Sequence, residues 1–176
     1  MSEESISSKD ISMYSLCIRE AEKSTLFYQH GCIATHGGKI IARGCNTSKC
    51  SSQSDYFLQE TCSCHAEINV LRQIYYNKRR RYNERKLKNY FKKTTLYISR
   101  SNRIRGTKLL YNSAPCEDCL SQIQMFNIKR IVYCMNNNIY SVNPDNMSTT
   151  HKTFGKNMLE EKGVSNGKKK FHKLDK

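Results

Sequence analysis

Apolar residues recur along the chain at two spacings, which predicts an alternation of helices and strands. Residues 13 to about 25 have the three- and four-residue spacing of an amphipathic helix. Two short strand-like runs follow at 31–35 and 39–44, and Gly37-Gly38 between them supplies the positive φ angles of a tight hairpin turn. The first part of the chain therefore predicts a helix followed by a β-hairpin.

The rest of the chain continues this alternation. A helix is predicted from Cys64 to roughly Arg80 and another from Cys116 to about Asn127, and residues 78–93 are also helix-like. Strands are predicted at 95–99, 130–135 and 139–142. This order predicts an α/β protein, a three-layer α/β/α domain around one mixed sheet of about five strands. We expect a polar segment at 1–12, this domain at 13–150 and a basic tail at 151–176.

One pair of motifs carries the candidate chemistry. His65 and Glu67 form an H-x-E motif, and Pro115, Cys116 and Cys119 follow in a P-C-x-x-C motif. This pair is the signature of zinc-dependent nucleobase deaminases. His65, Cys116 and Cys119 would hold Zn²⁺ and leave a fourth tetrahedral position for water, whose pKa the metal lowers to about 7. Glu67 would not bind the metal and would move protons as the catalytic residue.

The spacing of the motifs adds some geometry. Cys116 and Cys119 lie three residues apart, so they share one face at the start of a helix, where Pro115 suits the first position. His65 and Glu67 would diverge on an ideal helix, so they can converge only if the opening turn departs from one. A structural zinc site is the main rival, but it needs a fourth protein ligand and leaves Glu67 without a task.

Composition narrows the class of protein. No apolar run approaches the ~20 residues that a membrane span requires, and the polar N-terminus does not resemble a secretory signal. The nine cysteines then suggest an intracellular protein with reduced thiols, cytoplasmic or nuclear and not secreted. The chain also resembles short deaminase-like proteins of large DNA viruses, which makes a viral origin one alternative. The net charge of +15 is concentrated in residues 78–93, with nine basic residues and one acidic residue, and in smaller clusters at 100–108 and 152–176. Such clusters favour anionic partners, although a solvated lysine-rich surface explains them equally well.

Residues 13–143 resemble the cytidine/deoxycytidylate deaminase superfamily. The stretch from His65 to Asn69 is similar to its deoxycytidylate branch, and residues 31–46 and 128–133 match its first hairpin and the strand after the second zinc helix. The resemblance implies a substrate pocket formed with Asn46, which would bind the sugar hydroxyl, and with Ala66, Ser113 and Ala114. It also implies a nucleotide substrate, and we expect a homo-oligomer with no membrane partner.

The chain also departs from the family pattern. Residues 100–114 form a longer link than many members have, and the candidates for binding a phosphate there are Arg100, Arg103, Arg105 and Lys108. Three cysteines, Cys50, Cys62 and Cys64, crowd the loop at 46–63. They would need a further ligand, such as His30 or His36, to hold a second zinc, so free thiols are the default interpretation.

Three hypotheses for function follow. The leading one is a zinc hydrolase that converts a cytosine nucleotide, dCMP first among them, to the uracil nucleotide and ammonia. The second is a deaminase that edits RNA, including adenine in tRNA, or single-stranded DNA, because aromatic residues interleave with the basic ones: Tyr75, Tyr76, Tyr82, Tyr90 and Phe91. Burial of those rings is the simpler alternative. The third is a basic nucleic-acid-binding protein with a deaminase fold and no activity.

Overall fold

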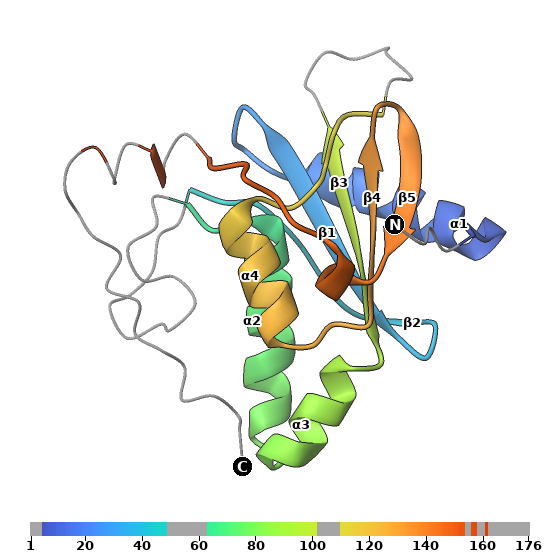
Figure 1. The fold of residues 1–176 in the computed structure, drawn as a ribbon, viewed down its shortest axis with the longest axis vertical. Coiled ribbons are helices and arrows are strands. Elements are labelled where there is room, and N and C mark those ends of the chain that lie inside the picture. Colours follow the sequence, from blue (N-terminus) through green and yellow to red (C-terminus); the bar gives the residue numbers. More distant parts are fainter. Residues whose placement is uncertain (1–4, 49–62, 102–109, 154–155, 158–160, 162–176) are drawn as a thin grey trace.

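A computed structural model describes residues 5–48, 63–101, 110–153, 156–157 and 161. Helices cover both faces of one mixed sheet (Figure 1), as predicted from the sequence. The elements in chain order are α1 (Ser8–Ala21), β1 (Gln29–His36), β2 (Lys39–Cys45), α2 (Ala66–Arg79), α3 (Glu84–Phe91), β3 (Thr94–Ser101), α4 (Glu117–Met125), β4 (Arg130–Met135), β5 (Asn138–Val142) and a short 3₁₀ helix (Pro144–Asn146).

The five strands lie in the order β2-β1-β3-β4-β5, and only β3 and β4 run parallel to each other. Side chains alternate between the two faces, as the two-residue period of a strand requires. On β3, Tyr97 belongs to the core under α1, whereas Leu96 and Ile98 belong to the larger core under α2 and α4. Helix α1 therefore covers one face and the other helices cover the opposite face.

The first helix begins five residues before the predicted Met13 and ends at Ala21, short of residue 25. Ser7 caps it: its hydroxyl accepts from the Asp10 backbone N–H, and the Asp10 carboxylate accepts from the Ser7 N–H, each at 3.1 Å. This capping box satisfies amides that the first turn leaves unpaired. The apolar pattern begins only at Met13, so the pattern alone missed the first turn.

The basic stretch 78–93 is not one continuous helix. α2 ends at Arg79, and α3 begins after Asn83, whose side chain accepts from the Lys86 N–H at 3.0 Å. The predicted helix after Pro115 also ends earlier than expected, at Met125, because Asn127 adopts a positive φ of 53° that a helix cannot continue.

Much of two expected loops and of the tail lies outside the described residues. These parts are 49–62, 102–109 and 162–176. Among the helices that the structure describes, none has the length and apolar composition needed to cross a membrane.

Candidate metal centre

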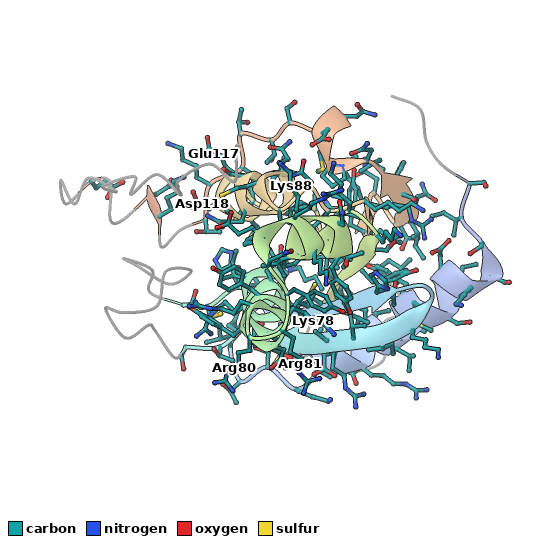
Figure 2. All side chains as sticks on the ribbon, turned by 90° about the horizontal axis from the view of Figure 1, so that it is seen from below. Lys78, Arg80, Arg81, Lys88, Glu117 and Asp118 are labelled. Carbon is teal, nitrogen blue, oxygen red and sulfur yellow. The ribbon has the colours of Figure 1, made fainter. Side chains whose placement is uncertain are left out.

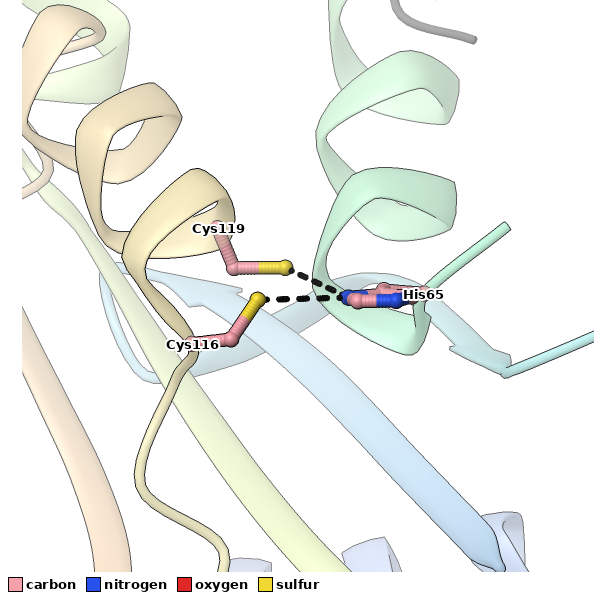
Figure 3. A group of neighbouring side chains, drawn as sticks. All are labelled: His65, Cys116 and Cys119. Carbon is pink, nitrogen blue, oxygen red and sulfur yellow. Dashed lines mark hydrogen bonds between the residues drawn. The ribbon is translucent and has the colours of Figure 1, made fainter. Parts of the chain in front are cut away.

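Three side chains from two helix starts converge on the face of the sheet covered by α2 and α4 (Figure 3). The Nδ1 atom of His65 lies 3.1 Å from the Cys119 sulfur and 3.5 Å from the Cys116 sulfur. Cys116 and Cys119 are buried, and His65 is half-buried. The three residues that the sequence selected as metal ligands therefore lie together.

The local backbone explains how they meet. His65 is the N-cap of α2 and Cys116 is the N-cap of α4, both in extended conformation, with φ/ψ of −69°/154° and −72°/170°. Each of these two side chains therefore projects from the N-terminal end of its helix, and Cys119 follows one turn later on α4. Pro115 precedes this cap and does not occupy the first helical position, which corrects the prediction. Neither N-cap side chain forms a capping hydrogen bond with the backbone of its own helix, so both are available to a ligand.

The three atoms fit a zinc ion. With Zn–S near 2.3 Å and Zn–N near 2.05 Å, a tetrahedral ion separates a sulfur from a nitrogen ligand by about 3.5 Å. The observed separations of 3.1 and 3.5 Å are close to this value. Two thiolates and an imidazole are also the donor set that zinc prefers. No other group of three possible ligands is formed by the residues that the structure describes.

The electrostatics of the three side chains also favour a cation. Hydrogen bonding with Cys119 and then with His65 lowers the pKa of Cys116 to about 4, against the effect of burial. The hydrogen bond with Cys116 raises the pKa of His65 to about 9, and the same thiolate and burial raise the pKa of Cys119 well above its usual range. One thiolate thus shares protons with its two neighbours, and a dication would displace those protons because ligands bind deprotonated.

Glu67 lies beside this cluster without being one of the three ligands. It occupies the first turn of α2, is 5% exposed, and its carboxyl forms a hydrogen bond with the Cys119 thiol. Burial raises the pKa of the Glu67 carboxyl above its usual value. A buried carboxyl at this position can exchange protons with a molecule held at the metal.

The start of β1 lies near the site, and the sequence did not assign it to the metal centre. Burial, followed by the charges of Arg100 and His65, lowers the pKa of His30 to about 4, which indicates that His30 lies near the metal cluster. Asn46 holds the start of this strand: its side chain accepts from the His30 N–H at 2.8 Å and donates to the Tyr28 carbonyl at 2.7 Å. The register of His30 opposite Arg100 is visible only in the paired strands.

The predicted pocket residues have different surroundings. Ala66 is fully buried at the start of α2 and Ala114 is half-buried beside the core. The Ser113 hydroxyl donates to the Ile98 carbonyl at 2.7 Å and accepts from the Cys134 N–H at 2.9 Å. Both contacts join Ser113 to the sheet, so its side chain supports the site from within the fold. Contacts between these residues and a substrate remain predictions.

Among the candidates for phosphate binding, Arg100 is described, and its guanidinium lies 4.7 Å from the centre of the Tyr28 ring. The other three candidates, Arg103, Arg105 and Lys108, lie outside the described residues, as do Cys50 and Cys62.

The residues considered for a second zinc that the structure does describe do not assemble into such a site. Cys64 is buried and donates to the carbonyl of His65 at 3.5 Å. His36 stacks on Tyr90, with ring centres 4.2 Å apart. Neither belongs to the one ligand group found in this part of the chain.

Comparison with known proteins identifies the family. Residues 7–135 match the family model described as the cytidine and deoxycytidylate deaminase zinc-binding region. The 1.6 Å crystal structure of a cytidine deaminase from Burkholderia pseudomallei is similar at 15% identity with a TM-score of 0.48, covering 76% of this chain and 91% of that chain. A search of curated proteins found no significant match. Because the family model spans most of the chain and includes all three converging ligands, this protein belongs to the zinc-binding cytidine and deoxycytidylate deaminase family.

Proposed function

We propose that this deaminase converts a cytosine nucleotide, dCMP in particular, to the uracil nucleotide and ammonia. One observation carries the proposal: the buried Glu67 carboxyl interacts with all three residues of the ligand cluster and is not one of its members. A structural zinc site would use four protein ligands and would not need such a carboxyl. The intact set also argues against a binding protein that has lost its activity.

The residues of the chain divide the chemistry between them. Zinc, when bound, supplies the Lewis acidity that makes water nucleophilic at neutral pH. His65, Cys116 and Cys119 would hold it at the mouths of α2 and α4. Glu67 would take one proton from the attacking water and deliver it to N3 of the cytosine ring. It would then take the second proton from the hydroxyl added at C4 and deliver it to the departing amine. One carboxyl can serve these transfers in turn because each uptake of a proton is followed by a delivery, which restores the carboxylate.

Arg100 is the described residue best placed to recognise a 5′-phosphate. It lies near the end of β3, opposite His30 of β1, and the charges of both Arg100 and His65 act on His30. The guanidinium lies over the Tyr28 ring, which holds it in a defined orientation. A charged hydrogen bond to phosphate contributes about 1.5–3 kcal/mol, or roughly 10- to 100-fold in affinity.

The decisive experiment measures kcat/KM on deoxycytidine, dCMP and a single-stranded oligonucleotide with one cytosine. We expect dCMP to exceed deoxycytidine by about 10- to 100-fold, and Arg100→Gln to remove most of that advantage without changing turnover of deoxycytidine. Arg19→Gln, an exposed arginine on α1, is the matched control and should behave as wild type. Equal turnover of deoxycytidine and dCMP would refute phosphate recognition.

Glu67→Gln tests the catalytic assignment. The variant should keep its zinc and fold and lose about 10²–10⁴-fold in kcat, the usual contribution of a general acid–base. Loss of zinc would instead place Glu67 among the ligands. Preferred turnover of the oligonucleotide, or of adenine in RNA, would favour the editing hypothesis, and an inactive wild-type protein with full zinc would favour the binding hypothesis.

A further inference from the structure

The strongest charge concentration in the molecule forms a surface that the deaminase chemistry does not use. Residues 78–93, here called the basic helix pair, comprise the end of α2, a turn and α3, and Glu84 is their only acidic residue. Figure 2 views the molecule along this end, with Lys78, Arg80 and Arg81 at the α2 end and Lys88 on α3. The exposed basic side chains include Arg80, Arg81, Arg85, Lys86, Lys92 and Lys93.

Aromatic rings underneath order part of this surface. The Lys78 ammonium lies 4.8 Å from the centre of the Tyr90 ring and 5.6 Å from that of Tyr82. Tyr90 also stacks on His36 of β1, with an interplanar angle of 8°. These rings are half-buried and already contact cations or other rings, so they are poorly placed to stack on bases. The surface presents charges rather than base-stacking platforms.

His36 responds to this local field. Burial lowers the pKa of His36, and the charges of Lys93 and Lys78 lower it further. The positive potential of the basic helix pair therefore extends to its neighbours in the fold. A polyanion is the partner that such a potential attracts.

We propose that the basic helix pair is a docking surface for the phosphate backbone of a nucleic acid, bound without regard to sequence. An anionic membrane fits less well, because a membrane-surface helix also inserts exposed apolar side chains. Leu87 and Phe91 of α3 are buried in the core, and the exposed large hydrophobic residues among those described lie elsewhere, on α1, the α1–β1 loop and β2.

This surface is separate from the metal centre. His65 caps the first turn of α2, whereas the basic residues lie at its end, 14 residues away. At 1.5 Å per residue the helix spans about 21 Å. Docking therefore occurs beyond the reach of a mononucleotide in the site, and the proposal does not depend on the proposed deaminase activity.

The test is fluorescence anisotropy of a labelled oligothymidylate of about thirty nucleotides, a probe chosen because it contains no cytosine. Each phosphate contact adds about 0.7 to the slope of log Kd against log salt for a single strand. Arg80→Gln/Arg81→Gln removes two such contacts and should therefore reduce the slope by about 1.4. If the variant and wild type bind equally near 1 M salt, where the charges are screened, the variant should bind about 25-fold more weakly than wild type at 0.1 M salt. Lys9→Gln/Arg19→Gln, exposed on α1 with the same loss of charge, is the control and should retain nearly wild-type binding.

Two further measurements complete the experiment. Deamination of dCMP should be unchanged in Arg80→Gln/Arg81→Gln, which distinguishes a failure of docking from a failure of the proposed function. The thermal midpoint of each variant should match wild type, because the exchanged side chains are exposed. Equal weakening by the two double variants would overturn the proposal, as would a Kd that does not depend on salt. Tighter binding to phosphatidylserine vesicles than to the oligonucleotide would also overturn it and assign the surface to membranes.

Discussion

Asp10 connects α1 to the sheet through a buried polar network, and Asp10→Asn should destabilise the protein. Its carboxylate accepts from the Arg130 guanidinium at 2.6 Å, the Tyr97 hydroxyl at 2.8 Å and the Ser7 hydroxyl at 2.6 Å. The Asp10 residue is 2% exposed. Asparagine preserves the shape but removes the charge, and its amide would direct hydrogens towards groups that are themselves donors.

The magnitude follows from the pKa of Asp10. Burial raises this pKa, but the hydrogen bonds from Ser7, Tyr97 and Arg130 outweigh burial and lower it from 3.8 to about 2. One pKa unit corresponds to 1.36 kcal/mol of preference for the charged form. The ionised carboxylate should therefore contribute about 2 kcal/mol at pH 7, and Asp10→Asn should lose about that amount.

The pH dependence has a definite sign. Because the folded-state pKa is the lower of the two, the contribution is complete above pH 3.8 and is lost as the pH falls towards 2. Urea unfolding of wild type and Asp10→Asn, at matched pH and metal content, should differ by about 2 kcal/mol at pH 7 and about 1 kcal/mol at pH 3. Taking the difference at each pH removes the contributions of other carboxylates and of zinc.

Glu22→Gln is the control for this prediction. Glu22 is an exposed carboxylate that immediately follows α1, and its neutralisation should change stability by less than about 0.5 kcal/mol. The reasoning fails if Asp10→Asn is as stable as wild type at pH 7, or if its deficit is undiminished at pH 3. Either outcome would mean that the network is not stabilised by the ionised carboxylate.

Three further changes test other parts of the structure. Cys116→Ala should abolish stoichiometric zinc, measured by atomic absorption, and lower the thermal midpoint, because binding free energy is also folding free energy, whereas Cys134→Ala, under α1, should keep its zinc. Gly31→Ala would place a Cβ 2.5 Å from the backbone nitrogen of Ala21, so α1 must shift and chemical unfolding should show a loss of about 1–3 kcal/mol. Asn83→Ala removes the cap of α3 and should cost about 1 kcal/mol in the same assay, and an unchanged midpoint would contradict that role.

The sequence predicted the layered architecture because each main element has enough apolar residues to show its period. The buried face of α2 and the apolar run of β4 are examples, and both lie where they were expected. The metal ligands were also predictable, since few arrangements other than a zinc site explain a histidine and two cysteines in those motifs. Their convergence depends on extended backbone at the two N-caps. The sequence indicated this only indirectly, because the spacing in H-x-E does not fit an ideal helix.

The remainder required three-dimensional information. The start of α1 depends on a capping box in a segment without apolar periodicity. The position of His30 beside the metal centre depends on pairing between β1 and β3, whose register no local pattern reveals. The aromatic residues of the basic stretch could be buried or free by sequence alone, and only their neighbours in the fold distinguish the two.

The hydrogen bonds of Ser113 determine where the chain can change in length without disturbing the metal centre. The parallel pairing of β3 and β4 ends at Ile98 and Tyr133, and just beyond that point the Ser113 hydroxyl spans the two strands. The chain is thus tied to the sheet three residues before Cys116. The position of the Cys116 thiolate is therefore set by the sheet and not by the segment before Ser113. Insertions or deletions between Ser101 and Leu110 should then leave the geometry of the metal ligands intact. Selection or an engineer can therefore vary the length of the chain between Ser101 and Leu110 independently of the metal centre.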